Sequence, residues 1–157
     1  MKRALFLYSK SDSTKAEQLK DYLQVKLGSL VSLRNTVDVL AEEQKLKDEL
    51  PRSDCVVLIG SPQAFSLIHN KRTEIEDGFV TFDGKLFHKE FTENKDLVRE
   101  RMIIVYFTER TKNDWIPTDF DERRIFHMES GKIRRGNPDL AMIEHFMEEL
   151  LVEKIRV

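Results

Sequence analysis

The 157-residue chain has few of the residues that mark several common protein classes. It has one cysteine, Cys55, so it cannot form an intramolecular disulfide, and a disulfide-rich secreted scaffold is excluded. No apolar run approaches the roughly 20 residues that span a bilayer, and the run at residues 4–8 is too short for a signal-peptide core. We therefore expect a cytoplasmic protein that does not insert into membranes, with Cys55 as a packed, unreactive thiol.

Glycine is also scarce, with six residues, and none lies in the polar loop after the first apolar run, at residues 9–13. Dinucleotide-binding and Walker loops need glycines at such a place, so both are excluded. The sequence has no Gly-x-Ser-x-Gly nucleophile elbow, and its four histidines are far apart, which gives no support for a hydrolase triad or a metal site. The net charge of −2 provides no basic field for nucleic acid. We expect no metal, no cofactor and no nucleic-acid partner.

Three continuous apolar runs, at residues 4–8, 55–59 and 102–107, predict buried parallel strands. The middle run is followed at once by Ser61, a good helix N-cap, and by Pro62, which is preset for the first helical turn. Strands that alternate with helices predict an α/β fold, a flavodoxin-like three-layer sandwich with a five-stranded parallel sheet. We expect residues 1–157 to form one such domain, with residues 55–59 as the central strand.

The remaining elements are predicted from caps and from helical spacing. Thr14 and Glu17 have capping-box spacing for a helix that ends at Gly28. The second strand lies at residues 30–33 or, as a rival, at 37–40, and residues 125–128 form a short last strand. Asn137 caps the final helix.

Residues 70–100 contain two turn signals, Asp77-Gly78 and Asp83-Gly84, and several phenylalanines. An insertion with this many aromatic residues is expected to be packed. Glu74 and Glu76 follow the Pro62 helix near the carboxyl edge of the sheet, where sites in open α/β sheets are built. A carboxylate there stabilises an oxocarbenium-like transition state on a ribose, or it belongs to a solvated acidic turn.

The order of these motifs resembles TIR-type domains. Residues 4–9, Ala-Leu-Phe-Leu-Tyr-Ser, resemble their first box, a strand that ends in Tyr-Ser. Residues 53–62 resemble their central strand, which ends in Ser-Pro, and residues 102–107 resemble their fourth strand. The resemblance spans nearly the whole chain and implies the fold already expected from the strand pattern.

Further stretches resemble the SEFIR branch, the cytoplasmic domains of interleukin-17 receptors and their adaptor. The segment between Pro62 and Met102 is longer than in most TIR domains, and its residues 85–91 are similar to a SEFIR insertion. Residues 105–109, followed by Trp-Ile-Pro at 115–117, resemble the SEFIR fourth strand and the loop after it. Residues 37–44 resemble the SEFIR second strand and its exit.

The resemblance implies an intracellular signalling domain that associates with other SEFIR or TIR-like domains or with itself, without catalysis. We expect binding through the surface of residues 63–91. Aromatic and aliphatic anchors carry most interface energy, and charged residues set orientation. The candidate interaction residues are Gln63, Phe65, Ile68, Lys71, Arg72, Glu74, Phe82 and Phe87, and some of the apolar ones are expected to belong to the core.

The alternative is an NAD glycohydrolase, with NAD as its substrate. Enzymatic TIR domains carry a catalytic glutamate on the helix after the Ser-Pro box, and Glu74 lies near the matching position. The Trp-Cys pair that often precedes this glutamate is absent, and residues 69–71 are His-Asn-Lys instead. Glu76-Asp77-Gly78 is similar to part of a nucleoside deoxyribosyltransferase pattern, a spacing that is frequent by chance.

Overall fold

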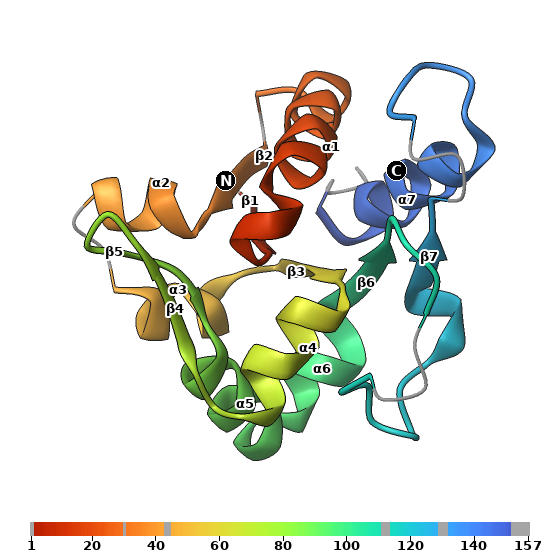
Figure 1. Ribbon diagram of the computed structural model, residues 1–157. Helices are drawn as coiled ribbons and strands as arrows, with labels where there is room; N and C mark the ends of the chain where they lie inside the picture. The colour runs from red at the N-terminus through yellow and green to blue at the C-terminus, as the bar shows by residue number, and fades with distance from the viewer. Residues whose placement is uncertain (1, 30, 43–44, 111–113, 129–131, 152–157) are drawn as a thin grey trace.

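A five-stranded parallel sheet forms the centre of the protein, as a computed structural model of residues 2–29, 31–42, 45–110, 114–128 and 132–151 shows (Figure 1). The strand order is β2-β1-β3-β6-β7, and every neighbouring pair in this sheet is parallel. The strands are β1 (Lys2–Leu7), β2 (Val31–Asn35), β3 (Cys55–Gly60), β6 (Met102–Tyr106) and β7 (Ile125–His127). The predicted fold class is confirmed, and β3 is the central strand, as its continuous apolar run predicted.

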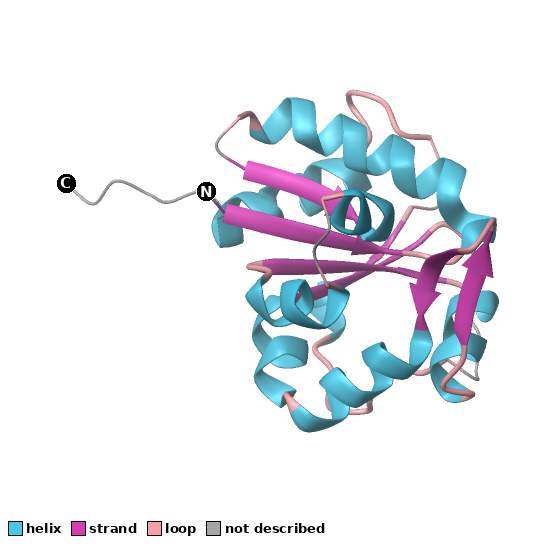
Figure 2. Cartoon of the chain, turned by 90° about the vertical axis from the view of Figure 1, so that its left-hand side faces the viewer, coloured by secondary structure: helices cyan, strands magenta, loops and turns pink. Residues whose placement is uncertain are grey.

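Helices cover both faces of the sheet and give the three layers (Figure 2). One face packs against the first and last helices, α1 (Ser13–Leu27) and α7 (Pro138–Leu151). The helices on the other face are α2 (Thr36–Ala41), α3 (Leu46–Arg52), α4 (Pro62–His69) and α5 (Gly84–Glu93). A further helix, α6 (Lys95–Arg101), packs on α5 and β6, and two short 3₁₀ helices lie at Lys10–Asp12 and Glu122–Arg124. Within the described ranges, no helix has the length and apolar character to cross a bilayer.

The predicted helix ends are mostly confirmed. The Ser61 hydroxyl accepts the backbone N–H of Ala64 at the start of α4, and the Asn137 side chain accepts backbone N–H groups at the start of α7. Gly28 ends α1 with a φ of 81°, a backbone conformation that favours glycine. The predicted capping box at Thr14 is wrong: α1 begins at Ser13, and no side chain caps it.

The second strand is β2, and the rival segment at residues 37–40 belongs to helix α2. Asn35 decides this outcome. Its Oδ1 atom accepts the N–H of Asp38 at 2.8 Å, while the Asp38 carboxylate accepts the N–H of Asn35 at 3.0 Å. This reciprocal capping box starts a helix where the SEFIR resemblance implied a strand. Residues 43–44 of that resemblance lie outside the described residues.

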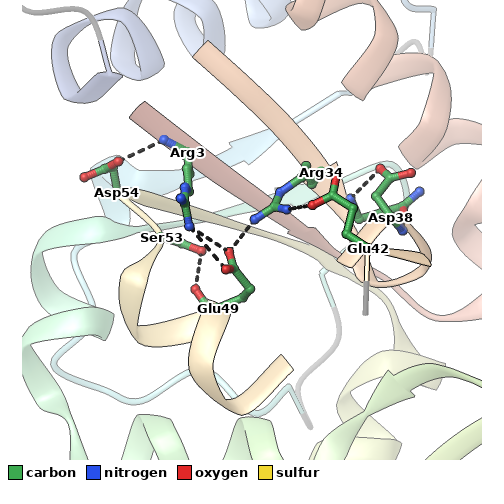
Figure 3. A network of polar contacts seen from close by, with 8 residues as sticks. Arg3, Arg34, Asp38, Glu42, Glu49, Ser53 and Asp54 are labelled. Atoms are coloured by element: carbon green, nitrogen blue, oxygen red, sulfur yellow. Dashed lines mark hydrogen bonds and ion pairs between the residues drawn. The ribbon is translucent and has the colours of Figure 1, made fainter. Parts of the chain in front are cut away.

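A buried carboxylate joins α3 to the two strands at one side of the sheet (Figure 3). The Glu49 side chain is 3% exposed and accepts hydrogen bonds from Arg3 of β1, at 3.2 Å, and from Arg34 of β2. Arg34 also pairs with Glu42, just after α2. Because a buried carboxylate needs compensation for lost hydration, these two arginines fix the position of α3 on the sheet.

The segment after α4 forms a separate antiparallel hairpin of β4 (Thr73–Glu76) and β5 (Phe79–Asp83). Its two-residue turn has positive φ at both Asp77 (51°) and Gly78 (81°), as hairpins of this length prefer, so this turn prediction is confirmed. The Asp83-Gly84 signal marks a helix start instead, because the Asp83 carboxylate accepts the N–H of Leu86 in α5. Figure 2 shows the hairpin standing across the carboxyl ends of the parallel strands.

Candidate functional site

The carboxyl ends of the neighbouring strands β1 and β3 are tied together by side chains. β1 leads to α1 on one face of the sheet and β3 leads to α4 on the other, so their loops diverge at the place where open α/β sheets bind ligands. The Ser61 hydroxyl donates a hydrogen bond to the Asp12 carboxylate at 2.6 Å and so links the loop after β3 to the loop after β1. Burial raises the pKa of Asp12, partly offset by the hydrogen bond from Ser61.

The hairpin is held over this edge by Glu74, which lies in β4. One carboxylate oxygen accepts the backbone N–H of Lys10 at 2.6 Å and the Thr81 hydroxyl at 2.8 Å. The other oxygen accepts the Gln63 side-chain amide at 2.9 Å. With three donors from three segments of the chain, Glu74 acts as a tie between the hairpin, the first loop and α4.

A second contact, from the Lys10 ammonium to Glu76 at 2.6 Å, joins two residues that line a small pocket of about 170 Å³. The pocket is flanked by Tyr8, whose hydroxyl accepts the Asn35 amide at 2.9 Å. Burial, followed by the nearby Glu17 carboxylate, raises the pKa of Tyr8 well above its usual value. The polar groups of this edge pocket are therefore largely paired with one another.

Two large hydrophobic side chains are exposed near the tip of the hairpin, one on each face, because Ile75 pairs with Val80 and Phe79 pairs with Glu76. Ile75 is 63% exposed and Phe79 is 64% exposed, on opposite sides of the acidic turn. Val37, on the neighbouring helix α2, is also exposed, and α2 packs against β5. Large exposed hydrophobic side chains that lie near one another are a feature of protein-binding surfaces.

The four apolar anchors predicted from the sequence are not on the surface, and this assignment is corrected. Phe65 and Ile68 point from α4 into the core, and Phe82 and Phe87 lie with them in the same buried cluster. Phe87 packs on Phe91 with ring centroids 4.0 Å apart, and Trp115 packs edge-on against both rings. The insertion thus has a small aromatic core of its own, continuous with the core of the domain, and none of the four side chains is available to a partner.

Of the polar candidates, Gln63, Lys71 and Arg72 are exposed and Glu74 is half-buried. Gln63 bonds Glu74, and Lys71 and Arg72 are exposed in the connection between α4 and β4. The Arg72 backbone donates to the Leu67 carbonyl and accepts the N–H of Gly84, both at 2.9 Å. These contacts fix both ends of the hairpin to the end of α4.

Glu74 differs in its setting from the glutamate implied by the TIR resemblance. That residue belongs to a helix, whereas Glu74 belongs to a strand beyond the end of α4. The sequence reasoning missed Ile75 and Phe79 as surface residues. The signal was present: Asp77-Gly78 lies between two short β-prone runs, which is the pattern of a two-residue hairpin.

No group of three or more potential metal ligands occurs among the described residues. No protein-family model matches the chain, and no curated protein matches it either. The site is therefore interpreted from its own geometry.

Proposed function

We propose that this chain is a protein-association domain of the SEFIR or TIR-like kind, which acts in intracellular signalling by binding other domains of the same fold. The observation that carries the proposal is the pair Ile75 and Phe79, exposed on a hairpin that the rest of the domain holds in place. The motif order of the sequence supports this kind of domain, and the exposed hairpin residues support the hairpin as its binding element.

The hairpin is a preorganised element, which favours binding. Glu74 and Glu76 attach one side of it to Lys10, and the Arg72–Gly84 hydrogen bond closes its base. A binding element that is ordered before the encounter avoids part of the entropic cost of association. This arrangement suits recognition by shape and apolar contact.

The same contacts give little support to cleavage of NAD by Glu74. A carboxylate that stabilises positive charge on a ribose must face the sugar. The Glu74 oxygens face Lys10, Gln63 and Thr81 instead. Glu74 is better described as the residue that positions the hairpin.

The proposal is tested by binding measurements against a panel of purified SEFIR and TIR-like domains, this chain included. The test variant is Ile75→Thr with Phe79→Thr, which keeps β-propensity and removes the apolar surface. Met142→Gln is the matched control, because Met142 is an exposed hydrophobic residue on α7. We expect saturable binding to at least one panel member, weakened tenfold or more by the double variant and unchanged by the control.

Incubation of the pure protein with NAD, followed by measurement of nicotinamide, is the second arm. We expect no release above the background. Absence of binding to every panel member, or Glu74-dependent release of nicotinamide at enzyme-like rates, overturns the proposal.

A further inference from the structure

The two edge strands of the parallel sheet differ in length. β7 has three residues, whereas β2, at the other edge, has five and pairs among the described strands with β1 alone. An unpaired edge of this length presents backbone N–H and C=O groups that can pair with a strand of another molecule, and proteins protect such edges with side chains or short strands. The groups that occupy the free edge of β2 therefore decide whether the sheet can grow there.

The side chain of Gln24, on α1, occupies the middle of this edge. Its Oε1 atom accepts the backbone N–H of Leu33 at 3.0 Å, and its Nε2 atom donates to the backbone carbonyl of Val31 at 2.9 Å. A residue of a further parallel strand would bond the edge in the same way, through one acceptor and one donor to backbone groups two residues apart. The Gln24 amide therefore takes the place of a neighbouring strand.

The amide is held in this position by further contacts around the edge. Nε2 also donates to the carbonyl of Gly28, which ends α1, at 3.1 Å. The next N–H along the edge, that of Asn35, donates to the Asp38 carboxylate at 3.0 Å. Lys20, one turn before Gln24 on α1, pairs with that carboxylate at 3.5 Å. Side chains thus follow the edge of β2, and Gln24 is the one that bonds its central backbone groups.

We propose that the Gln24 amide keeps β2 from pairing with the β2 strand of a second copy. Without the amide, the backbone groups of Val31 and Leu33 are left to another partner. Two copies of the same strand edge complement each other when they run antiparallel about a two-fold axis, so the assembly closes at two copies. This inference does not depend on the proposed association function, which uses Ile75 and Phe79 of the hairpin.

The experiment measures self-association of the full chain by sedimentation velocity, from about 10 μM to about 1 mM, a range suited to a small interface. Every protein carries Ile75→Thr with Phe79→Thr, so that association through the hairpin does not contribute, and this double variant is the parent. The test variant is Gln24→Met, which keeps the length and helix propensity of the side chain and removes the amide. Gln18→Met is the matched control, because Gln18 is an exposed residue of the same helix.

A second variant, Gln24→Glu, separates protection of the edge from attachment of α1 to the sheet. Its carboxylate cannot donate to the carbonyls of Val31 and Gly28, so the attachment is weakened as it is in Gln24→Met. The carboxylate also places a charge on the edge, which opposes strand pairing. We expect Gln24→Glu to stay monomeric despite the lost hydrogen bonds.

Gln24→Met should dimerise at least tenfold more tightly than Gln18→Met, which should sediment as the parent does. Hydrogen exchange of the Leu33 amide gives the local readout. In Gln24→Met, this amide should exchange at least about tenfold more slowly at about 1 mM than at about 10 μM, because strand pairing protects it. In the parent and in Gln18→Met, its exchange should not depend on concentration, because Gln24 of the same molecule protects it.

Three results overturn the proposal: Gln24→Met that stays monomeric at about 1 mM, Gln24→Glu that associates to the same extent, or dimers in which the Leu33 amide exchanges independently of concentration. If Gln24→Met does not fold, Gln24→Ala is measured in its place. Failure of both to fold shows that the amide is required for folding rather than for protection of the edge, and it overturns the proposal as well. The association function stands or falls separately, since the parent lacks its two hairpin residues.

Discussion

Gly84 is the position where adding a single methyl group should destabilise the hairpin most. It is the first residue of α5, and a Cβ atom there would lie 2.2 Å from the Leu67 carbonyl oxygen and 2.5 Å from that of Arg72. Contacts of this kind below 3.0 Å are essentially never observed, so the chain must move by about 0.8 Å. The obstacles are backbone atoms, which cannot turn away as a flexible side chain can.

The loss in the free energy of unfolding is estimated from the steric overlap and from the hydrogen bonds that this movement breaks. Overpacking of a close contact costs about 1–3 kcal/mol, and each of the two backbone hydrogen bonds that join Leu67, Arg72 and Gly84 contributes about 1 kcal/mol. The better helix propensity of alanine returns at most about 1 kcal/mol. Gly84→Ala should therefore lower the free energy of unfolding by about 2–4 kcal/mol, which for a domain of this size lowers the melting temperature by about 5–15 °C.

Urea and thermal unfolding measure the loss, and hydrogen exchange locates it. In Gly84→Ala, the amides of residues 73–83 should exchange faster than in the wild type. Gly136→Ala is the control: its φ is 93° with no atom within 4 Å of the new methyl, so it costs only backbone strain and should leave hairpin exchange unchanged. If Gly84→Ala had the melting temperature of the wild type and the hydrogen-exchange rates of its hairpin amides were unchanged, the reasoning would be refuted.

Three further predictions concern the core and the carboxyl edge. Glu49→Gln should lower the free energy of unfolding in urea by about 2 kcal/mol, because it leaves two arginines without their shared carboxylate. The control Glu42→Gln, at the exposed partner of Arg34, should lower it by under about 0.5 kcal/mol. Equal effects of the two variants would contradict the buried role of Glu49. Burial raises the pKa of the Cys55 thiol to about 12. A thiol reagent at pH 8 should therefore label the native protein at least about a thousandfold more slowly than the unfolded protein. Rapid labelling of the native protein would show that strand β3 is accessible to the reagent. Because burial raises the folded-state pKa of Asp12, the folded protein binds this proton more tightly than the unfolded chain, and stability should fall as the pH rises from the ordinary pKa of Asp12 through the raised one. Asp12→Asn should flatten this slope in unfolding measured from pH 3 to pH 7 and raise stability at neutral pH; a steeper slope would contradict the assignment.

The sheet could be predicted from the sequence because its strands are covered on both faces. The runs at residues 55–59 and 102–107 have no polar residue to suggest a solvent-facing side, and the structure buries both strands completely. The second strand was ambiguous for a local reason. Val37 and Val39 favour a strand by propensity, but the reciprocal hydrogen bonds of Asn35 and Asp38 start a helix there.

The apolar residues predicted as interface anchors are buried, so the prediction of their exposure was wrong. Phe65, Phe82 and Phe87 are of a residue type that often anchors interfaces. Residue type alone does not distinguish an exposed aromatic side chain from a buried one, and these three are buried. The burial of Phe87 depends on Trp115, which comes from a loop almost thirty residues further along the chain. Ile75 and Phe79 could be found only by recognising the hairpin first, since their exposure follows from the turn between them.

The hairpin leaves the domain and returns to it at nearly the same point. Its two flanking residues, Arg72 and Gly84, are joined by a backbone hydrogen bond of 2.9 Å, and the parallel sheet is complete without the residues between them. Because the two ends of the hairpin touch, its tip can be exchanged without moving the scaffold, provided that Phe82 stays in the core. Replacing residues 75–80 by the tip of a related hairpin should therefore change the exposed side chains and leave a domain that still folds.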